Sequence, residues 1–273
     1  MSMAVDTHAH PLTRKLSFLR VVRSELLKLR TLRSTWIMLL VMLVLFIAFG
    51  ALAALSTTGQ ISDGSGTPPP KLDPVTTVLA GAGFAVLVMS VFGVLSGARE
   101  YSSGMIRATL SFVPRRLYVL GGKAIALLIF VIPVTMVAAL GAFVLGMAVL
   151  SAAGSQTASL TDADSLRVLI GTTINISGLA LIGLALGMAM RSMPGAIATV
   201  IGVVLILPGL LTALLPESWR VGLKFLPSNA IAEASQIDVP DGMLGLWPGL
   251  LVFLAWVVAC LVLAGFLLVR RDA

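Results

Sequence analysis

The chain has 273 residues, of which 58% are hydrophobic and only 11% are charged. Soluble domains carry about 25% charged residues, so this composition excludes an ordinary soluble fold and predicts a protein embedded in lipid. The net charge is +7. Such a charge suits either nucleic-acid binding or a membrane orientation, and the positions of the basic residues decide between the two.

Residues 16–36, LSFLRVVRSELLKLRTLRSTW, predict a cationic amphipathic helix ahead of the first apolar run. Helical periodicity places one apolar face on Phe18, Leu19, Val22, Leu26 and Leu29, and Leu27 breaks the pattern. A helix of this kind lies in the headgroup layer, although an ordinary basic flank of a span remains the alternative. The predicted interface anchors here are Arg20, Arg23, Lys28, Arg30 and Trp36.

Six apolar segments are long enough to cross about 30 Å of hydrocarbon. They cover residues 36–55, 75–96, 117–150, 168–190, 194–215 and 247–269. The third is long for one crossing, so it either tilts or begins outside the hydrocarbon. Pro133 and Pro208 predict kinks in the third and fifth segments.

The charges between the spans predict the orientation. With both termini in the cytoplasm, fifteen basic residues lie inside and four outside, whereas four acids lie inside and eight outside. Because positive charge resists translocation, this orientation is favoured, and the basic charge indicates topology and argues against nucleic acid. We therefore expect an all-α, multi-pass membrane protein with both termini in the cytoplasm, as one transmembrane domain over residues 1–273.

Within that domain, residues 1–34 form a cytoplasmic tail and an interfacial helix, and residues 216–246 form an external loop with short helices. This loop either shapes an exit mouth or connects two spans. No Asp or Glu falls in the middle of a span, which argues against a proton-driven carrier but leaves sodium coupling open. Lys123 is the only cation within a span, and it lies close enough to the cytoplasmic end to extend into the headgroups.

Milder polar residues occur within the spans. They either line a substrate path or hydrogen-bond between helices, and the candidates are Thr135, Thr172, Asn175 and Ser177. The stretch GLALG, from Gly183 to Gly187, matches the GxxxG pattern of close helix packing. The sequence has no Walker A motif, no catalytic set and no metal-ligand cluster, so if the protein moves something uphill, a partner supplies the energy.

Residues 99–123, REYSSGMIRATLSFVPRRLYVLGGK, separate the second and third apolar segments. Ser102, Ser103 and Gly104 predict a turn, and MIRATLSF predicts a short helix that Pro114 ends. Arg115, Arg116 and Lys123 are predicted interface anchors at the foot of the next span. A short cytoplasmic helix held by two spans suits a mechanical contact with another protein.

These residues resemble a known family. EYSSGMIRATLSFVPRRLYVLGGKAIA is similar to the segment after the second helix in ABC-2-type exporter permeases, with Met105 where Thr is usual. RSELLKLRTLRSTW resembles the elbow helix that opens such permeases, especially actinobacterial ones. The resemblance covers nearly the whole chain, and it implies six spans, an elbow helix and a cytoplasmic coupling helix.

The resemblance also implies partners. Such permeases dimerise with a second copy or a paralogue and bind separate cytoplasmic ATPase subunits, which hold ATP and Mg²⁺, so the chain is not an enzyme by itself. The implied coupling residues are Glu100, Tyr101, Ser102, Gly104, Met105, Ile106, Arg107 and Leu110. Glu100, Arg107, Arg115 and Arg116 either contact the ATPase or hold the segment in place. The predicted function is export of an amphiphilic or apolar drug, lipid or antimicrobial peptide. The alternatives are a self-contained secondary transporter and a membrane assembly factor.

Overall fold

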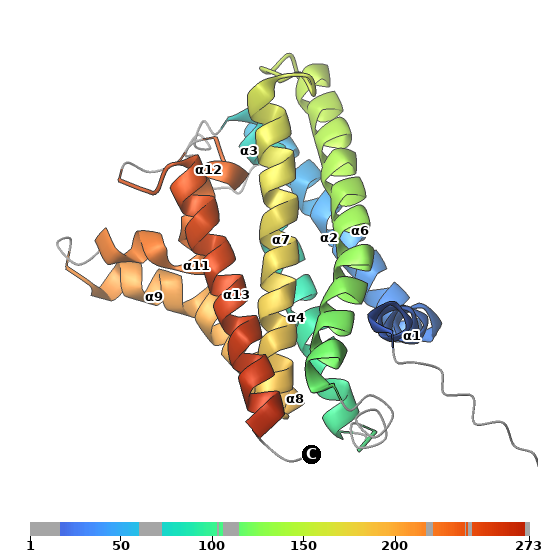
Figure 1. Cartoon of the computed structure of the whole chain (residues 1–273). Coiled ribbons are helices and arrows are strands. Elements are labelled where there is room, and N and C mark those ends of the chain that lie inside the picture. Colours follow the sequence, from blue (N-terminus) through green and yellow to red (C-terminus); the bar gives the residue numbers. More distant parts are fainter. Residues whose placement is uncertain are drawn as a thin grey trace, which may run out of the picture.

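A computed structural model describes residues 17–59, 73–102, 104–105, 115–216, 221–237, 239 and 242–270. Every regular element in these ranges is a helix, which confirms the expected all-α fold. The long helices stand side by side in a bundle, and α1 lies crosswise against it (Figure 1). Helix α1 and the C-terminal end of α13 lie towards the same end of the bundle, which is called the α1 end below.

In the described residues, five helices are long and apolar enough to cross a membrane. A bent pair of shorter helices brings the number of crossings to six if the pair forms one span. The five are α2 (Arg33–Thr57), α4 (Ala82–Ser102), α6 (Arg116–Ala152), α7 (Ala163–Met190) and α13 (Leu246–Arg270). The shorter helices are α1 (Phe18–Thr31), α3 (Pro74–Val78), α8 (Met193–Val200), α9 (Leu207–Leu214), α11 (Pro227–Ala230) and α12 (Ala232–Ser235). A π-helical stretch, η1 (Ile201–Ile206), joins α8 to α9, and a 3₁₀ turn, η2 (Val221–Phe225), precedes α11.

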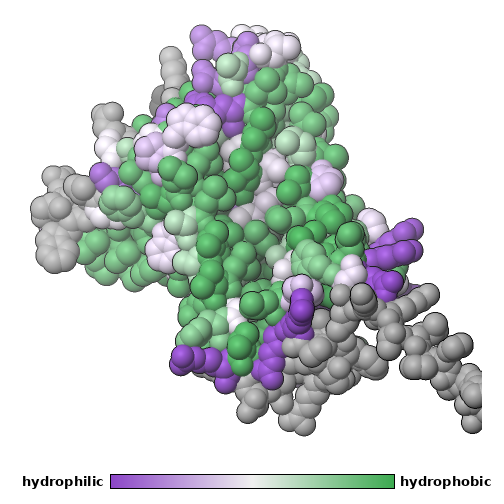
Figure 2. Space-filling model, viewed as in Figure 1, coloured by the Kyte–Doolittle hydropathy of each residue, from purple (hydrophilic) through white to green (hydrophobic). Residues whose placement is uncertain are grey.

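Helix α7 is the centre of the bundle. In the most apolar stretch of α7, 83% of the residues are buried by the rest of the protein, compared with 28% in the corresponding stretches of α2 and α13. The outer helices therefore keep large apolar faces exposed, and Figure 2 shows hydrophobic surface over the middle of the molecule with hydrophilic residues towards its two ends. This distribution suits a bundle whose outer surface contacts lipid.

Glycines bring α4 and α7 into backbone contact. A Cβ on Gly93 would lie 1.9 Å from the carbonyl oxygen of Ala180, and one on Gly183 would lie 2.2 Å from that of Ser90. Gly97 and Gly187, one turn further along, are similarly close to the partner backbone. The helices are thus packed through two GxxxG patterns, called the glycine contact below, and the packing interpretation of Gly183–Gly187 is confirmed.

The second expected crossing, residues 75–96, is not one continuous helix. Asp73 caps α3 through its side chain, which accepts hydrogen bonds from the backbone of Val75 and Thr76, and α3 ends at Val78. A turn at residues 79–81 then leads into α4. Gly81 sits against the α2 backbone, where a Cβ would be 2.0 Å from the carbonyl oxygen of Phe46. The close approach of α2 at this turn accounts for the interruption.

The fifth expected crossing, residues 194–215, is bent by 40° between its two halves. The bend coincides with η1 and precedes Pro208, as a proline kink predicts. Pro208 itself fits the first turn of α9, where its missing N–H has no partner to lose. None of the α9 residues is buried, and α9 projects sideways from the bundle of long helices (Figure 1).

Candidate functional site: an ionic cluster where three helices meet

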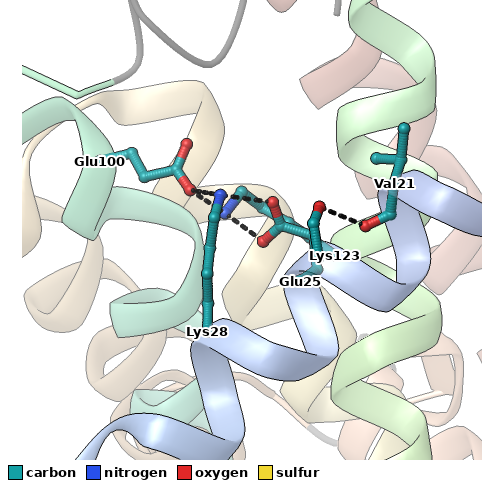
Figure 3. Close-up of polar contacts among 6 residues, drawn as sticks. Val21, Glu25, Lys28, Glu100 and Lys123 are labelled. Atoms are coloured by element: carbon teal, nitrogen blue, oxygen red, sulfur yellow. Dashed lines mark hydrogen bonds and ion pairs between the residues drawn. The ribbon is translucent and has the colours of Figure 1, made fainter. Parts of the chain in front are cut away.

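Four charged side chains meet at the α1 end of the bundle. Glu25 and Lys28 come from α1, Glu100 from the last turn of α4, and Lys123 from the start of α6 (Figure 3). Lys28 Nζ donates to Glu25 Oε1 at 2.6 Å and to Glu100 Oε1 at 2.7 Å. Lys123 Nζ donates to Glu25 Oε2 at 2.9 Å and to Glu100 Oε1 at 2.7 Å. Each ammonium therefore bridges both carboxylates, and this set is called the ionic cluster below.

The ionic cluster is balanced in charge and mostly buried. Glu25, Glu100 and Lys123 keep only 4%, 7% and 6% of their surface exposed. Lys28 is partly exposed; burial by itself would lower the pKa of Lys28, but hydrogen bonds to Glu100 and Glu25 outweigh this and raise the pKa above its ordinary value. Buried charges are tolerated only when paired, so the cluster requires α1, α4 and α6 to stay together.

The burial of Lys123 overturns one expectation. Its ammonium does not extend into the headgroup layer, because it is enclosed by Glu25 and Glu100. Of the two roles left open for Glu100, this geometry favours holding the segment in place, since the carboxylate is directed into the bundle. The signal available in the sequence was Glu25, the only acid in the basic stretch of residues 16–36.

The docked face of α1 also differs from the expected one. Its buried residues are Val21, Val22, Glu25 and Leu29, whereas Leu19 is 77% exposed. Gly122 of α6 permits this docking, since a Cβ there would lie 2.9 Å from a Val21 methyl group. Because of the ion pairs and this close approach, the face of α1 that packs against the bundle differs from the face that hydrophobicity alone predicts.

The other predicted anchors lie around the ionic cluster. Arg20, Arg23 and Arg30 are exposed on α1. Trp36 is 52% exposed and its indole N–H donates to the carbonyl oxygen of Arg30 at 2.9 Å. Exposed cations and a half-exposed tryptophan near the end of a span are typical of a membrane interface.

The first basic pair of α6 has two different environments. Arg115 is exposed and donates to the Tyr118 hydroxyl at 2.8 Å. Arg116 is partly buried and donates to the carbonyl oxygen of Leu268 at 2.8 Å, which joins the start of α6 to the end of α13. Arg116 thus donates a hydrogen bond to one of the carbonyl groups in the last turn of α13, which have no hydrogen-bond partner within the helix.

The predicted coupling segment is only partly described. Tyr101 is half-buried at the end of α4 with the guanidinium of Arg191 over its ring, 5.2 Å from the centroid. Ser102 ends α4, and Gly104 follows with a φ of +71°, a value that favours glycine. Met105 is 57% exposed. The remaining predicted residues, Ile106, Arg107 and Leu110, lie outside the described residues, as does most of the expected short helix.

The predicted substrate-path residues lie inside the bundle, away from the ionic cluster. Thr135 of α6 and Thr172 and Ser177 of α7 are buried, and Asn175 is partly buried. Hydroxyl or amide oxygens of all four lack a hydrogen-bond partner in the described structure. Buried polar groups without partners are unusual, so these four residues stay a candidate path.

Comparison with known proteins identifies the family. No curated protein matches the chain. A family model described as "ABC-2 family transporter protein" matches residues 21–209, which is well over half of the chain and extends from α1 to α9. The matched part includes all four residues of the ionic cluster and both halves of the glycine contact. The chain therefore belongs to the ABC-2 family of transporter proteins, as a multi-pass membrane protein.

Proposed function

We propose that this chain is the membrane subunit of an ATP-driven exporter in a bacterial cytoplasmic membrane. Two permease chains, either identical or paralogous, form the membrane part, and separate ATPase subunits bind at the α1 end. ATP and Mg²⁺ belong to those partners. Family membership supports the transport role, and the ionic cluster is the observation that supports coupling at this end.

Charge supports placing the α1 end in the cytoplasm. Within the described residues, this end carries two acids, Glu25 and Glu100, against eleven cations. The cations are Arg20, Arg23, Lys28, Arg30, Arg33, Arg99, Arg115, Arg116, Lys123, Arg191 and Arg270. The other described charged residues, which lie away from this end, are Asp73, Asp162, Asp164 and Glu233 with Arg167 and Lys224. Basic residues stay on the cytoplasmic side, so both termini lie there.

The ionic cluster supports a coupling role because it joins both arms of the predicted coupling segment. Glu100 is two residues from the end of α4, and Lys123 lies in the second turn of α6. A partner that pushes on residues 102–114 therefore acts on α4 and α6 together, with α1 fixed to both. An ATPase favours one arrangement of these helices only through contacts that differ between its nucleotide states.

The glycine contact supports transmission from α4 to the centre of the bundle. Helices in backbone contact move as one body, because sliding requires the Gly93 and Gly183 faces to separate first. Helix α7 carries three of the four substrate-path candidates, Thr172, Asn175 and Ser177. Movement of α4 would thus reposition these side chains. The lack of acids in the middle of the spans favours an amphiphilic or apolar cargo.

The decisive experiment is co-purification of the tagged permease with the Walker A protein encoded beside it. Arg107→Glu combined with Met105→Asp should leave membrane insertion normal and abolish retention of the ATPase. Arg270→Glu is the matched control, since it also reverses a cation at the α1 end but lies on α13. Transport that persists without ATP and collapses with the ion gradient would instead identify a secondary transporter.

A further inference from the structure

A pocket of about 310 Å³ lies between α1, the start of α2, the end of α4 and the start of α6, and the four residues of the ionic cluster form part of its lining. Its walls are mainly apolar, formed by residues such as Leu32, Met38, Phe92 and Leu95. This volume is at the lower limit of about 300–1,000 Å³ for drug-sized ligand sites. The pocket therefore suits a slender apolar group, such as part of an acyl chain, better than a bulky ligand.

Both helical walls change from polar to apolar in the same direction. Along α4, Arg99, Ser96, Leu95 and Phe92 line the pocket at helical spacing, so they succeed one another on one face from the α1 end inwards. On α2, which runs the opposite way, Ser34 and Met38 repeat this order, with a polar residue outside and an apolar one inside. A phospholipid aligned with the membrane has the same order of head, ester and chain.

The charges at the mouth favour an anionic headgroup. The two acids and two lysines of the ionic cluster balance one another in formal charge, and Arg99 adds one further positive charge to the residues that line this pocket. Arg99 is exposed, and both terminal nitrogens of its guanidinium lie 3.3 Å from the Ser34 hydroxyl. Arg30 and Arg33, which adjoin lining residues in the sequence, are also exposed.

One buried group in the wall has an unmet hydrogen bond. The hydroxyl oxygen of Ser96 is buried and has no hydrogen-bond partner in the described structure. It lies one helical turn inward from Arg99, at the level where a lipid headed by Arg99 would place its ester oxygens. An ester carbonyl oxygen would accept a hydrogen bond from this hydroxyl and remove the cost of leaving the group unpaired.

We propose that this pocket binds one anionic phospholipid of the surrounding leaflet. Its phosphate lies at Arg99, its ester oxygens lie near Ser96, and the upper part of one acyl chain fills the space between Phe92 and Met38. The bound lipid bridges α1, α2 and α4 beside the ionic cluster. The site depends only on the membrane setting of the chain, so it stands independently of ATPase coupling and export.

The test is native mass spectrometry of the full-length protein, without ATPase, titrated with phosphatidylglycerol or phosphatidylcholine. Wild type should retain one phosphatidylglycerol in preference to phosphatidylcholine. Arg99→Gln should weaken phosphatidylglycerol binding at least about tenfold, because it removes a charge-assisted contact to the phosphate. It should weaken phosphatidylcholine binding less, because the choline cation already offsets the charge of that phosphate, so the preference for phosphatidylglycerol should fall. Met38→Trp should block retention of both lipids by filling the pocket. Size-exclusion chromatography checks that each variant remains folded.

Arg270→Gln is the matched control, because Arg270 is an exposed cation at the same end but on α13. It should leave lipid binding unchanged. If Arg99→Gln and Arg270→Gln weakened phosphatidylglycerol binding equally, the effect would come from the general positive charge of this end, and the proposal would be overturned. Equal retention of the two lipids by wild type would also overturn it.

Discussion

Replacing Gly93 with alanine tests whether α4 and α7 form one rigid pair. The added methyl group would lie 1.9 Å from the Ala180 carbonyl oxygen, which belongs to the backbone of α7 and cannot rotate away. Gly83 of the same helix is the matched control, because a Cβ there meets nothing within 4 Å. Both substitutions add the same group to α4, so their difference isolates the steric effect.

The magnitude follows from the required displacement. To reach an ordinary contact of 3.4 Å, the helices must separate locally by about 1.5 Å, a gap that forfeits more than a quarter of the dispersion energy of each affected contact. Overpacking of this kind costs about 1–3 kcal/mol. Alanine also improves helix propensity over glycine by about 1 kcal/mol, which the control shares. Gly83→Ala should therefore be neutral or stabilising, whereas Gly93→Ala should be about 2 kcal/mol less stable than this control.

The assay is the fraction of protein that remains monodisperse after heating in detergent. For a chain of this size, about 2 kcal/mol corresponds to a difference of about 4–8 °C in the midpoint. Transport should fall in Gly93→Ala at temperatures where the variant stays folded, because α4 would no longer carry α7 with it. Equal midpoints for the two variants would refute the backbone contact, and unchanged transport would refute its role in transmission.

Further predictions concern the ionic cluster and two helix ends. Glu100→Gln should cost about 3–5 kcal/mol because it leaves buried Lys123 with one carboxylate, and adding Lys123→Met should recover part of the loss in a thermal unfolding assay. The control Asp164→Asn, which removes a carboxylate that is 70% exposed, should cost at most about 1 kcal/mol. Asp73→Ala removes the cap of α3 and should lower stability by about 0.5–2 kcal/mol, measured in the same way. Gly122→Leu should displace α1 from α6, and faster proteolytic cleavage within α1 would report it, whereas an unchanged cleavage rate would contradict the docking.

The apolar segments were sufficient to predict most of the membrane-spanning helices, because that signal is local. Each long helix contains the greater part of an expected segment, from residues 36–55 within α2 to residues 247–269 within α13. The interruption at Gly81 was missed because its cause is the backbone of Phe46, which is distant in the sequence. The Gly183–Gly187 pattern was recognised, but its partner Gly93–Gly97 was not, although the spacing is the same.

The ionic cluster could not be predicted from spacing because its partners are far apart in the chain. Lys123 is 98 residues from Glu25 and 23 residues from Glu100, separations that no helical periodicity relates. Lys28 and Lys123 each had a satisfactory local interpretation as an interface anchor, and Glu100 had one as a coupling residue. The error for Lys123 arose from treating a cation near the end of a span as free to extend into the headgroups, without considering that a neighbouring helix could supply carboxylates.

Stability alone does not explain four buried or half-buried charges at this junction. Well-packed apolar residues of similar volume are often as stabilising as a buried ion pair, whereas a broken pair is costly. A charged junction therefore tolerates few arrangements of its helices. Any movement of α4 relative to α6 that separates Glu100 from Lys123 leaves at least one buried charge without this partner. An apolar junction would permit gradual sliding. This difference suits the proposed coupling, in which a push on residues 102–114 must move α1, α4 and α6 together and reach α7 through the glycine contact.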